Sequence, residues 1–232
     1  MQTVGSHGTI PDLSPILRFA ATAVRDQRAL RRAIKRMPTP VPWDWASSRL
    51  IPLLSGPRFD EPGLPIVRAR SEIGPVVEFG LDLGGVFAIV DQAVADRWEC
   101  SADQLLARGL ANLRDWATDI ETHQVVTGVM SGRSIRLLMD RPAWASSILL
   151  DRDALGRLFG RHDQILAAPT TSSVVSLPFD TPDRVAADIV VDLEGSPLTS
   201  LFLDPFVLES GVLRWVGDAR EDDDDDLRTE RS

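Results

Sequence analysis

Lysine is nearly absent from this chain, and its scarcity excludes two kinds of catalytic site. Lys35 is the only lysine among 25 basic residues, and it follows Ile34 in an arginine-rich stretch. A P-loop needs a lysine between glycine and serine or threonine, and a Schiff-base enzyme needs a lysine in a pocket. We therefore expect neither chemistry in this protein.

Cysteine is limited to one residue, Cys100, which excludes an intramolecular disulfide. A chain without disulfides fits a reducing compartment. Cys100 stands just before Ser101, at the predicted start of a helix, where the helix dipole lowers the pKa of a thiol. A nucleophilic role is therefore open, although a lone cysteine is more often a small buried apolar residue.

Long apolar segments are also lacking. No stretch approaches the roughly 18 apolar residues of a membrane-spanning helix, and residues 1–13 lack the basic start and apolar run of a secretory signal. We therefore expect a bacterial-type cytoplasmic protein with no integral membrane segment. The net charge of −9 argues against nucleic acid as a partner, because nucleic-acid binding favours a basic surface.

Histidine is scarce too, which narrows the metal and acid–base chemistry. The three histidines, His7, His123 and His162, form no His-x-x-His or His-x-x-x-His spacing, and there is no Cys-x-x-Cys. We therefore predict no metal and no cofactor. His162 and Asp163 are weak site candidates that we interpret as a polar loop before a strand. A Ser-His-Asp set assembled in space stays open, because triad residues need not be neighbours in sequence.

The most unusual segment that is present is basic. Residues 15–37 carry apolar residues near helical spacing on one side, which predicts an amphipathic helix that ends at Pro38. Between residues 18 and 36, seven cations stand against one acidic residue. The simplest interpretation is a docked helix with its cations in water. An acidic protein, anionic lipid or nucleic acid is the alternative partner. The candidate interaction residues are Arg25, Arg28, Arg32 and Lys35.

The opposite charge gathers at residues 218–232, which hold eight acidic residues and three arginines. The continuous run Asp222–Asp226 repels itself, so we predict a disordered acidic tail. This tail is also a candidate for intramolecular pairing with the basic helix, which it would mask.

Between the charged ends, the sequence predicts short strands and helices. Residues 38–65 are rich in proline with interleaved tryptophans and predict an ordered linker. Strands are predicted at 77–83 and 86–90 around Gly84-Gly85, and a helix at 101–120 begins with a capping-box pattern. Further strands are predicted at 125–130, 135–139, 165–168, 174–177, 198–203, 206–208 and 212–216, and further helices at 151–159 and from 181.

Hairpins and helices are interspersed without a regular strand–helix alternation. This pattern favours the α+β class, with a mixed or mainly antiparallel sheet. We divide the chain into residues 1–63, with the basic helix and a Pro/Trp-rich segment, an α+β domain at 64–217, and the acidic tail at 218–232.

Several short motifs follow one another in a recognisable order. They are Asp82-Leu83 in a hairpin, Arg97-Trp98-Glu99-Cys100 before the helix cap, Ala111-Asn112-Leu113 in that helix, Trp144-Ala145-Ser146-Ser147, Ala168-Pro169 and Leu201–Phe206. In this order the chain resembles, over roughly residues 64–216, the YtpQ-like family of bacterial domains of unknown function. The resemblance implies an α+β fold and supplies no activity. Residues 170–172 are Thr-Thr-Ser where the family tends to carry a charged pair.

No catalytic motif stands out, so our leading hypothesis is a non-enzymatic protein-interaction or ligand-binding module with an unknown protein partner. One alternative is a small hydrolase or transferase that brings Cys100 or His162 to carboxylates such as Asp82. The other is nucleic-acid or membrane-surface binding through residues 15–37. Asn112 lies at the edge of the apolar face of helix 101–120 and is a weak site candidate, for which we favour a structural hydrogen bond.

Overall fold

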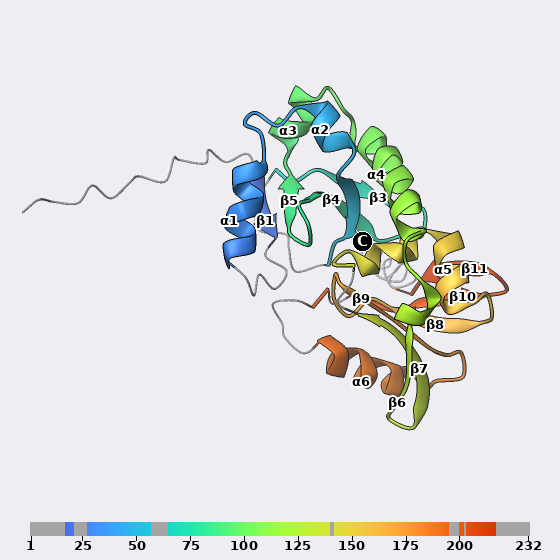
Figure 1. Ribbon diagram of the computed structural model, residues 1–232. Coiled ribbons are helices and arrows are strands. Elements are labelled where there is room, and N and C mark those ends of the chain that lie inside the picture. Colours follow the sequence, from blue (N-terminus) through green and yellow to red (C-terminus); the bar gives the residue numbers. More distant parts are fainter. Residues whose placement is uncertain are drawn as a thin grey trace, which may run out of the picture.

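Two antiparallel sheets with flanking helices make up the described part of this protein (Figure 1). The computed structural model describes residues 17–20, 27–56, 65–139, 142–194, 200–201 and 203–216, with side chains from residue 31 onward. Every strand pairing in the described part of the chain is antiparallel. The predicted α+β class with a mainly antiparallel arrangement is therefore confirmed.

The first sheet comes from the N-terminal half and has the strand order β1-β5-β4-β2, with β3 also paired to β4. Its strands are β1 (Leu17–Ala20), β2 (Leu50–Leu54), β3 (Arg68–Arg70), β4 (Val76–Asp82) and β5 (Phe87–Val90). β4 and β5 form the predicted hairpin. β5 is buried along its whole length and lies between β1 and β4, as its purely apolar sequence predicted.

Asp82 closes the turn between β4 and β5. Its Oδ1 atom accepts hydrogen bonds from the backbone N–H groups of Gly84 (2.8 Å) and Gly85 (2.9 Å). Both glycines have φ near +90°, a backbone conformation that costs glycine little because it has no Cβ. The turn therefore holds the Asp82 carboxylate at the end of β4.

The prediction of one helix over residues 15–37 is wrong in its first half. Leu17–Ala20 form β1, which pairs with β5, and the helix α1 spans only Gln27–Arg36. A strand of four residues has no period that local spacing can separate from a helical turn, and the open edge of β5 supplies its backbone partners. The helix ends as predicted, with Met37 N–H bonded to the Ile34 carbonyl just before Pro38.

The proline-rich segment expected to be a linker contains a helix, α2 (Trp43–Ser47), and the buried strand β2. Trp43 and Trp45 pack on the core, as predicted. Pro52 lies inside β2, which is tolerated because β2 hydrogen-bonds to β4 alone. A division of the chain between residues 63 and 64 therefore cuts through the first sheet.

The second sheet has the order β11-β10-β8-β9-β7-β6. Its strands are β6 (Val126–Met130), β7 (Arg133–Met139), β8 (Gln164–Ala167), β9 (Ser173–Pro178), β10 (Phe206–Glu209) and β11 (Val212–Trp215). These match the predicted strands within one or two residues. The strand predicted at 198–203 falls mostly outside the described residues, where Ser200 is seen in an isolated bridge with Thr170.

The helices after β5 agree with the predicted ones in part, since the helix predicted at 101–120 ends at 117 and a helix at 92–97 was not predicted. They are α3 (Gln92–Arg97), α4 (Ala102–Ala117), the 3₁₀ helix η3 (Ala145–Leu150), α5 (Arg152–Phe159) and α6 (Asp183–Glu194). Ser101 and Gln104 form the predicted capping box at the start of α4. α5 is capped by Asp151 and ends at Gly160, whose φ of 88° is of the kind that favours glycine.

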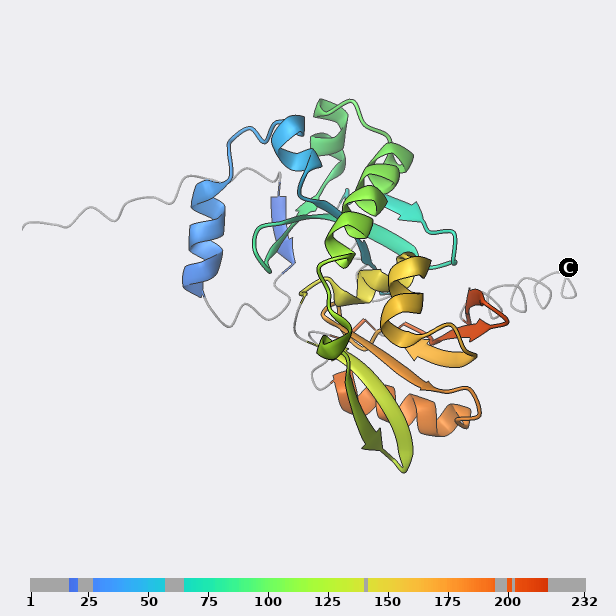
Figure 2. The same ribbon diagram turned by 45° about the vertical axis from the view of Figure 1, so that its right-hand side comes forward.

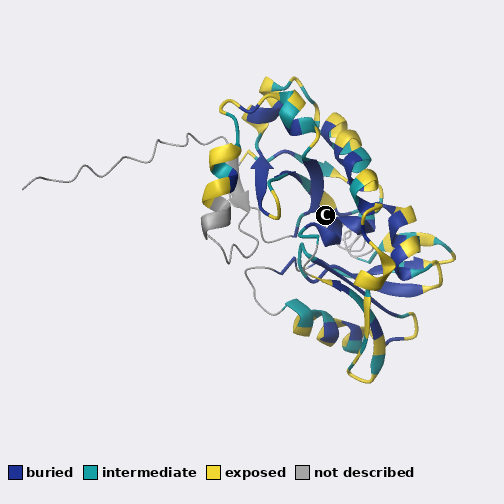
Figure 3. Cartoon of the chain, in the orientation of Figure 1, coloured by how far each residue is buried: buried dark blue, intermediate teal, exposed yellow. Residues whose placement is uncertain are grey.

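One hydrophobic core joins the two sheets. It includes Phe79 and Phe87 of the first sheet, Leu113 of α4 and Phe206 of the second sheet. A smaller core lies between α6 and the second sheet, around Ile189. Figure 3 shows buried residues running from one sheet into the other. α1 lies at one end of the molecule and β11 at the other in two views 45° apart (Figures 1 and 2). The predicted tail at 218–232 lies outside the described residues.

Candidate functional site

A pocket of about 570 Å³ lies between α1, the end of α2 and the β4–β5 turn. This volume is in the range of small-molecule sites. Three arginines and a single carboxylate stand among the lining residues, although the chain as a whole carries a net charge of −9. The lining consists of Arg32, Ala33, Arg36, Trp45, Arg49, Asp82, Leu83 and Gly84.

Two of the arginines come from α1. Arg32 and Arg36 are four residues apart in this helix, so they project from the same face one turn apart. Ala33, next to Arg32, is buried and also lines the pocket. Arg36 is exposed and forms no hydrogen bond or ion pair with any described residue. α1 therefore presents guanidinium groups along one wall of the pocket.

Arg49 lines the pocket from a second element, the connection between α2 and β2. Its Nη1 atom donates to the Trp45 carbonyl (2.8 Å) and to the Ser48 hydroxyl (3.1 Å). The guanidinium carbon lies 4.3 Å from the centre of the Trp45 ring, within the range of a cation–π contact. Arg49 has five N–H donors, and those on Nε and Nη2 bond to no described residue. The side chain is thus held in place with donors to spare.

The Asp82 carboxylate completes the lining from the end of β4. The Asp82 N–H group donates to the Arg49 carbonyl (2.8 Å), which fixes these two residues side by side. Its Oδ1 atom is taken by the turn, whereas Oδ2 bonds to no described residue. The pocket thus combines cationic donors with one spare carboxylate oxygen.

Asn112 holds the segment that carries Arg49, which is a structural role. It is buried in α4, and its Nδ2 atom donates to the carbonyls of Ser47 (2.7 Å) and Leu50 (2.8 Å). Arg108, one turn earlier, also donates to the Ser47 carbonyl (2.9 Å). The structural hydrogen bond predicted for Asn112 is therefore confirmed. It positions the pocket without lining it.

The predicted interaction residues of the basic helix fall in different places. Arg25 lies outside the described residues, and the side chain of Arg28 is not among those described. Arg32 lines the pocket, whereas Lys35 is exposed and lies outside the lining. Sequence reasoning missed Arg36 and Arg49. The i, i+4 spacing of Arg32 and Arg36 was a usable signal for the first, but no local pattern marks the second.

Cys100 sits in a setting that does not activate a thiol. Its Sγ atom lies 3.4 Å from the Trp98 carbonyl, and Trp98 packs on Trp43 with ring centres 5.4 Å apart. Burial raises the pKa of the Cys100 thiol above its ordinary value. This direction is opposite to the lowering that the position before α4 led us to expect, and its cause is desolvation of the thiol.

His162 and Asp163 form an exposed loop, as interpreted from the sequence. Asp163 Oδ1 accepts from the Ser210 N–H group (2.8 Å), so the carboxylate ties this loop to the β10–β11 turn. His123 is also exposed and lies 2.8 Å from a Glu121 carboxylate oxygen. No group of three His, Cys, Asp or Glu side chains in the described part of the chain is arranged to hold a metal ion.

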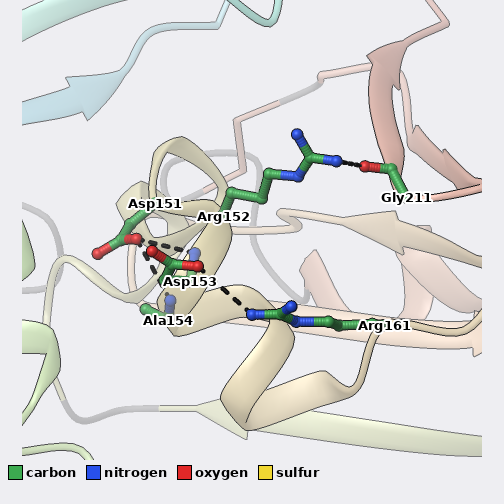
Figure 4. A network of polar contacts seen from close by, with 6 residues as sticks. All are labelled: Asp151, Arg152, Asp153, Ala154, Arg161 and Gly211. Atoms are coloured by element: carbon green, nitrogen blue, oxygen red, sulfur yellow. Dashed lines mark hydrogen bonds and ion pairs between the residues drawn. The ribbon is translucent and has the colours of Figure 1, made fainter.

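A second polar cluster, around α5, is concerned with structure. Asp151 accepts from the N–H groups of Asp153 and Ala154 and so caps the helix (Figure 4). In the same view Arg152 donates to the Gly211 carbonyl and Arg161 reaches Asp153 at 3.5 Å. Both arginines are exposed, and they bind the β10–β11 turn and the first turn of α5, outside the lining of the arginine pocket described above.

Comparisons with family models, curated proteins and solved structures gave no match to this chain. The resemblance to the YtpQ-like family therefore stays a prediction. Of the helices in the described ranges, none is both long and apolar enough to cross a membrane.

Proposed function

We propose that this protein is a non-enzymatic binding module that holds an anionic group of its ligand or partner in the arginine-lined pocket. The observation that carries the proposal is Arg49, a guanidinium group fixed by two hydrogen bonds and a tryptophan ring yet left with donors to spare. Arginine stays charged at any physiological pH and matches carboxylate and phosphate oxygens in geometry.

The fixed geometry of Arg49 favours binding over mere surface charge. A flexible arginine loses side-chain entropy when it closes on a ligand, and this loss offsets much of the gain of a surface ion pair. Arg49 has already lost that freedom in the folded protein, so less free energy is spent on ordering when an anion arrives. Arg36, from α1, adds a second cation whose attraction is screened by salt.

Titration calorimetry on the full chain tests the proposal. The probes are citrate, inorganic phosphate and a peptide with the sequence of residues 218–232, each at low and moderate salt. We expect at least one of these anions to bind, with affinity falling as salt rises. Arg36→Ala and Arg49→Ala should each weaken that binding by about tenfold, the value of one charge-assisted hydrogen bond.

Arg31→Ala is the matched control, because Arg31 is an exposed arginine of the same helix that does not line the pocket. It removes the same charge and should change the affinity by less than about twofold. Equal losses of anion affinity in Arg31→Ala, Arg36→Ala and Arg49→Ala would show that only the overall charge is involved, and they would overturn the proposal. Binding of the peptide would in addition support the predicted pairing of the acidic tail with α1.

A further inference from the structure

We infer that the anion held in this pocket is the phosphate of a small phosphomonoester that also carries an aromatic ring and hydroxyl groups. The inference rests on the proposed function and names its ligand class. Three features of the pocket carry it: guanidinium groups from two separate elements, apolar residues in the same lining, and the spare carboxylate oxygen of Asp82.

The placement of the arginines favours phosphate over carboxylate. A carboxylate is planar, and one bidentate arginine satisfies both of its oxygens. Arg36 reaches the pocket from α1, and Arg49 reaches it from the α2–β2 connection, so the two guanidinium groups belong to separate elements. A tetrahedral phosphate has oxygens that point in several directions and can accept from donors of both elements. A phosphomonoester also carries a charge of about −1.5 to −2 at pH 7, which suits a lining with more than one cation.

The size of the pocket favours a ligand with more than a phosphate. A water molecule occupies about 30 Å³ of liquid volume, so a phosphate group of a few heavy atoms fills a minor part of about 570 Å³. The rest of the lining includes Trp45, Ala33 and Leu83, which are apolar. A flat apolar group bonded to the phosphate would remove this surface from water, which stabilises the complex in proportion to the area buried.

Asp82 gives the third part of the inference. Its Oδ2 atom accepts no hydrogen bond from the described residues, and it lies in the same pocket as the arginines. A carboxylate accepts hydrogen bonds and donates none, so it favours a ligand hydroxyl and repels further phosphate groups. The ligand therefore pairs one phosphate with hydroxyl groups, and a diphosphate or triphosphate is expected to bind more weakly.

Adenosine monophosphate contains all three parts, and we use it as the probe. Calorimetry on the full chain compares it with inorganic phosphate, adenosine and adenosine triphosphate. We expect the monophosphate to bind about tenfold or more tightly than each of the other three. Arg49→Ala should lower its affinity by at least tenfold, and Arg49→Lys should restore only part of it, because lysine keeps the charge without the fork.

Asp82→Asn supplies a readout that a purely cationic site would not give. Because this change removes the negative charge that repels further phosphate groups, the ratio of the monophosphate affinity to the triphosphate affinity should fall severalfold. The amide oxygen that the change introduces can still accept from the turn, so the fold is expected to survive. A circular dichroism melt of each variant verifies that it is folded.

Two results overturn the inference. One is equal affinity for adenosine monophosphate and inorganic phosphate, and the other is monophosphate binding that is unaffected by Arg49→Ala. If citrate or the acidic peptide binds in an Arg49-dependent way while neither phosphate compound binds, the inference fails and the proposed function stands. If no anion binds in an Arg49-dependent way, both fail.

Discussion

Arginine does different work in two regions of this molecule. Where β7 and α4 meet α5, two arginines use their donors on backbone carbonyls. Arg136 donates to Leu158 and Phe159 (both 2.6 Å), and Arg157 donates to Ala117 and Ile120 (both 2.5 Å). In the pocket, Arg49 spends only Nη1 on its own surroundings. Arg136 and Arg157 therefore use their donors to stabilise the fold, whereas Arg49 keeps donors that bond to no described residue.

The difference suggests a criterion for ranking candidate binding arginines in a chain rich in arginine, namely how many of their donors the fold already uses. The last carbonyls of a helix have no partner within the helix. The Arg136 fork satisfies two of them at the end of α5, and the Arg157 fork reaches one at the end of α4 and the Ile120 carbonyl just beyond it. Arg49 also bonds to a last carbonyl of its helix, that of Trp45, but only through Nη1, so its Nε and Nη2 donors bond to no described residue. Number and exposure of arginines alone would not reveal this, because both kinds are partly exposed.

Asn112→Asp should have the largest effect on the pocket side of this comparison. It removes the hydrogen bonds that hold the segment carrying Arg49, and it buries a charge. Its amide nitrogen donates to Ser47 and Leu50, and a carboxylate there would face two carbonyl oxygens. We expect a loss of about 3–5 kcal/mol in unfolding free energy, the usual cost of an uncompensated buried charge. Urea unfolding measures it. Arg108→Ala, which removes the exposed bond to Ser47, should cost less than about 1 kcal/mol, and equal costs would contradict the role assigned to Asn112.

Arg136→Ala tests the structural side of the comparison. The change leaves the Leu158 carbonyl without its side-chain donor, leaves the Phe159 carbonyl with only the longer bond from Gln164 Nε2 (3.4 Å), and removes a cation from the Phe159 ring, 5.9 Å away. We expect a loss of about 2 kcal/mol in stability with no change in anion binding. Arg136→Lys should recover less than half, since it cannot reach both carbonyls as a fork. Thermal unfolding and calorimetry together measure both quantities, and weaker anion binding would erase the distinction between the two regions.

Arg49→Ala is the converse test, with an effect on binding and little on stability. Its bonds go to the Trp45 carbonyl and an exposed serine hydroxyl, which water can replace. We expect less than about 1 kcal/mol of destabilisation, together with the loss of anion binding described above. Urea unfolding of this variant beside Arg136→Ala makes the comparison direct. If Arg49→Ala destabilised the protein as much as Arg136→Ala, the Arg49 guanidinium group would serve mainly to stabilise the fold.

The elements that sequence reasoning found are those whose signals are local. The capping box at Ser101, the turn at Gly84-Gly85 and the helix stop at Gly160 each depend on residues a few positions apart. β1 and β2 were missed because what makes them strands is distant in sequence. β1 needs the edge of β5, and β2 contains Pro52, which locally argues against a strand.

The pocket, too, depends on contacts between residues distant in sequence, which local patterns do not reveal. Arg32 was named because it lies in a conspicuously basic helix, and Asp82 because it lies in a hairpin motif. That these two residues line one pocket with Arg49 depends on how α1 is placed against the first sheet. Nothing in the spacing of residues 32, 49 and 82 encodes that placement. The basic segment therefore pointed to one of the pocket arginines, and only the tertiary structure shows which residues line the pocket with it.

The smallest effect that we predict concerns Cys100, a residue that neither region uses. Because burial raises the pKa of its thiol, the thiolate fraction at pH 7 should lie below that of an ordinary cysteine. Alkylation by iodoacetamide should therefore be a few times slower in the native protein than in the urea-unfolded chain, which is the control for intrinsic reactivity. The raised pKa contributes stability while the thiol is protonated, below the unfolded pKa, and this contribution is lost as pH rises through the folded value. The alkylation rate follows the thiolate fraction, so in the native protein it should climb steeply only above about pH 9, the ordinary pKa of the thiol. A native rate faster than the unfolded one would indicate an activated thiol, and the hydrolase or transferase alternative would then gain over the binding module.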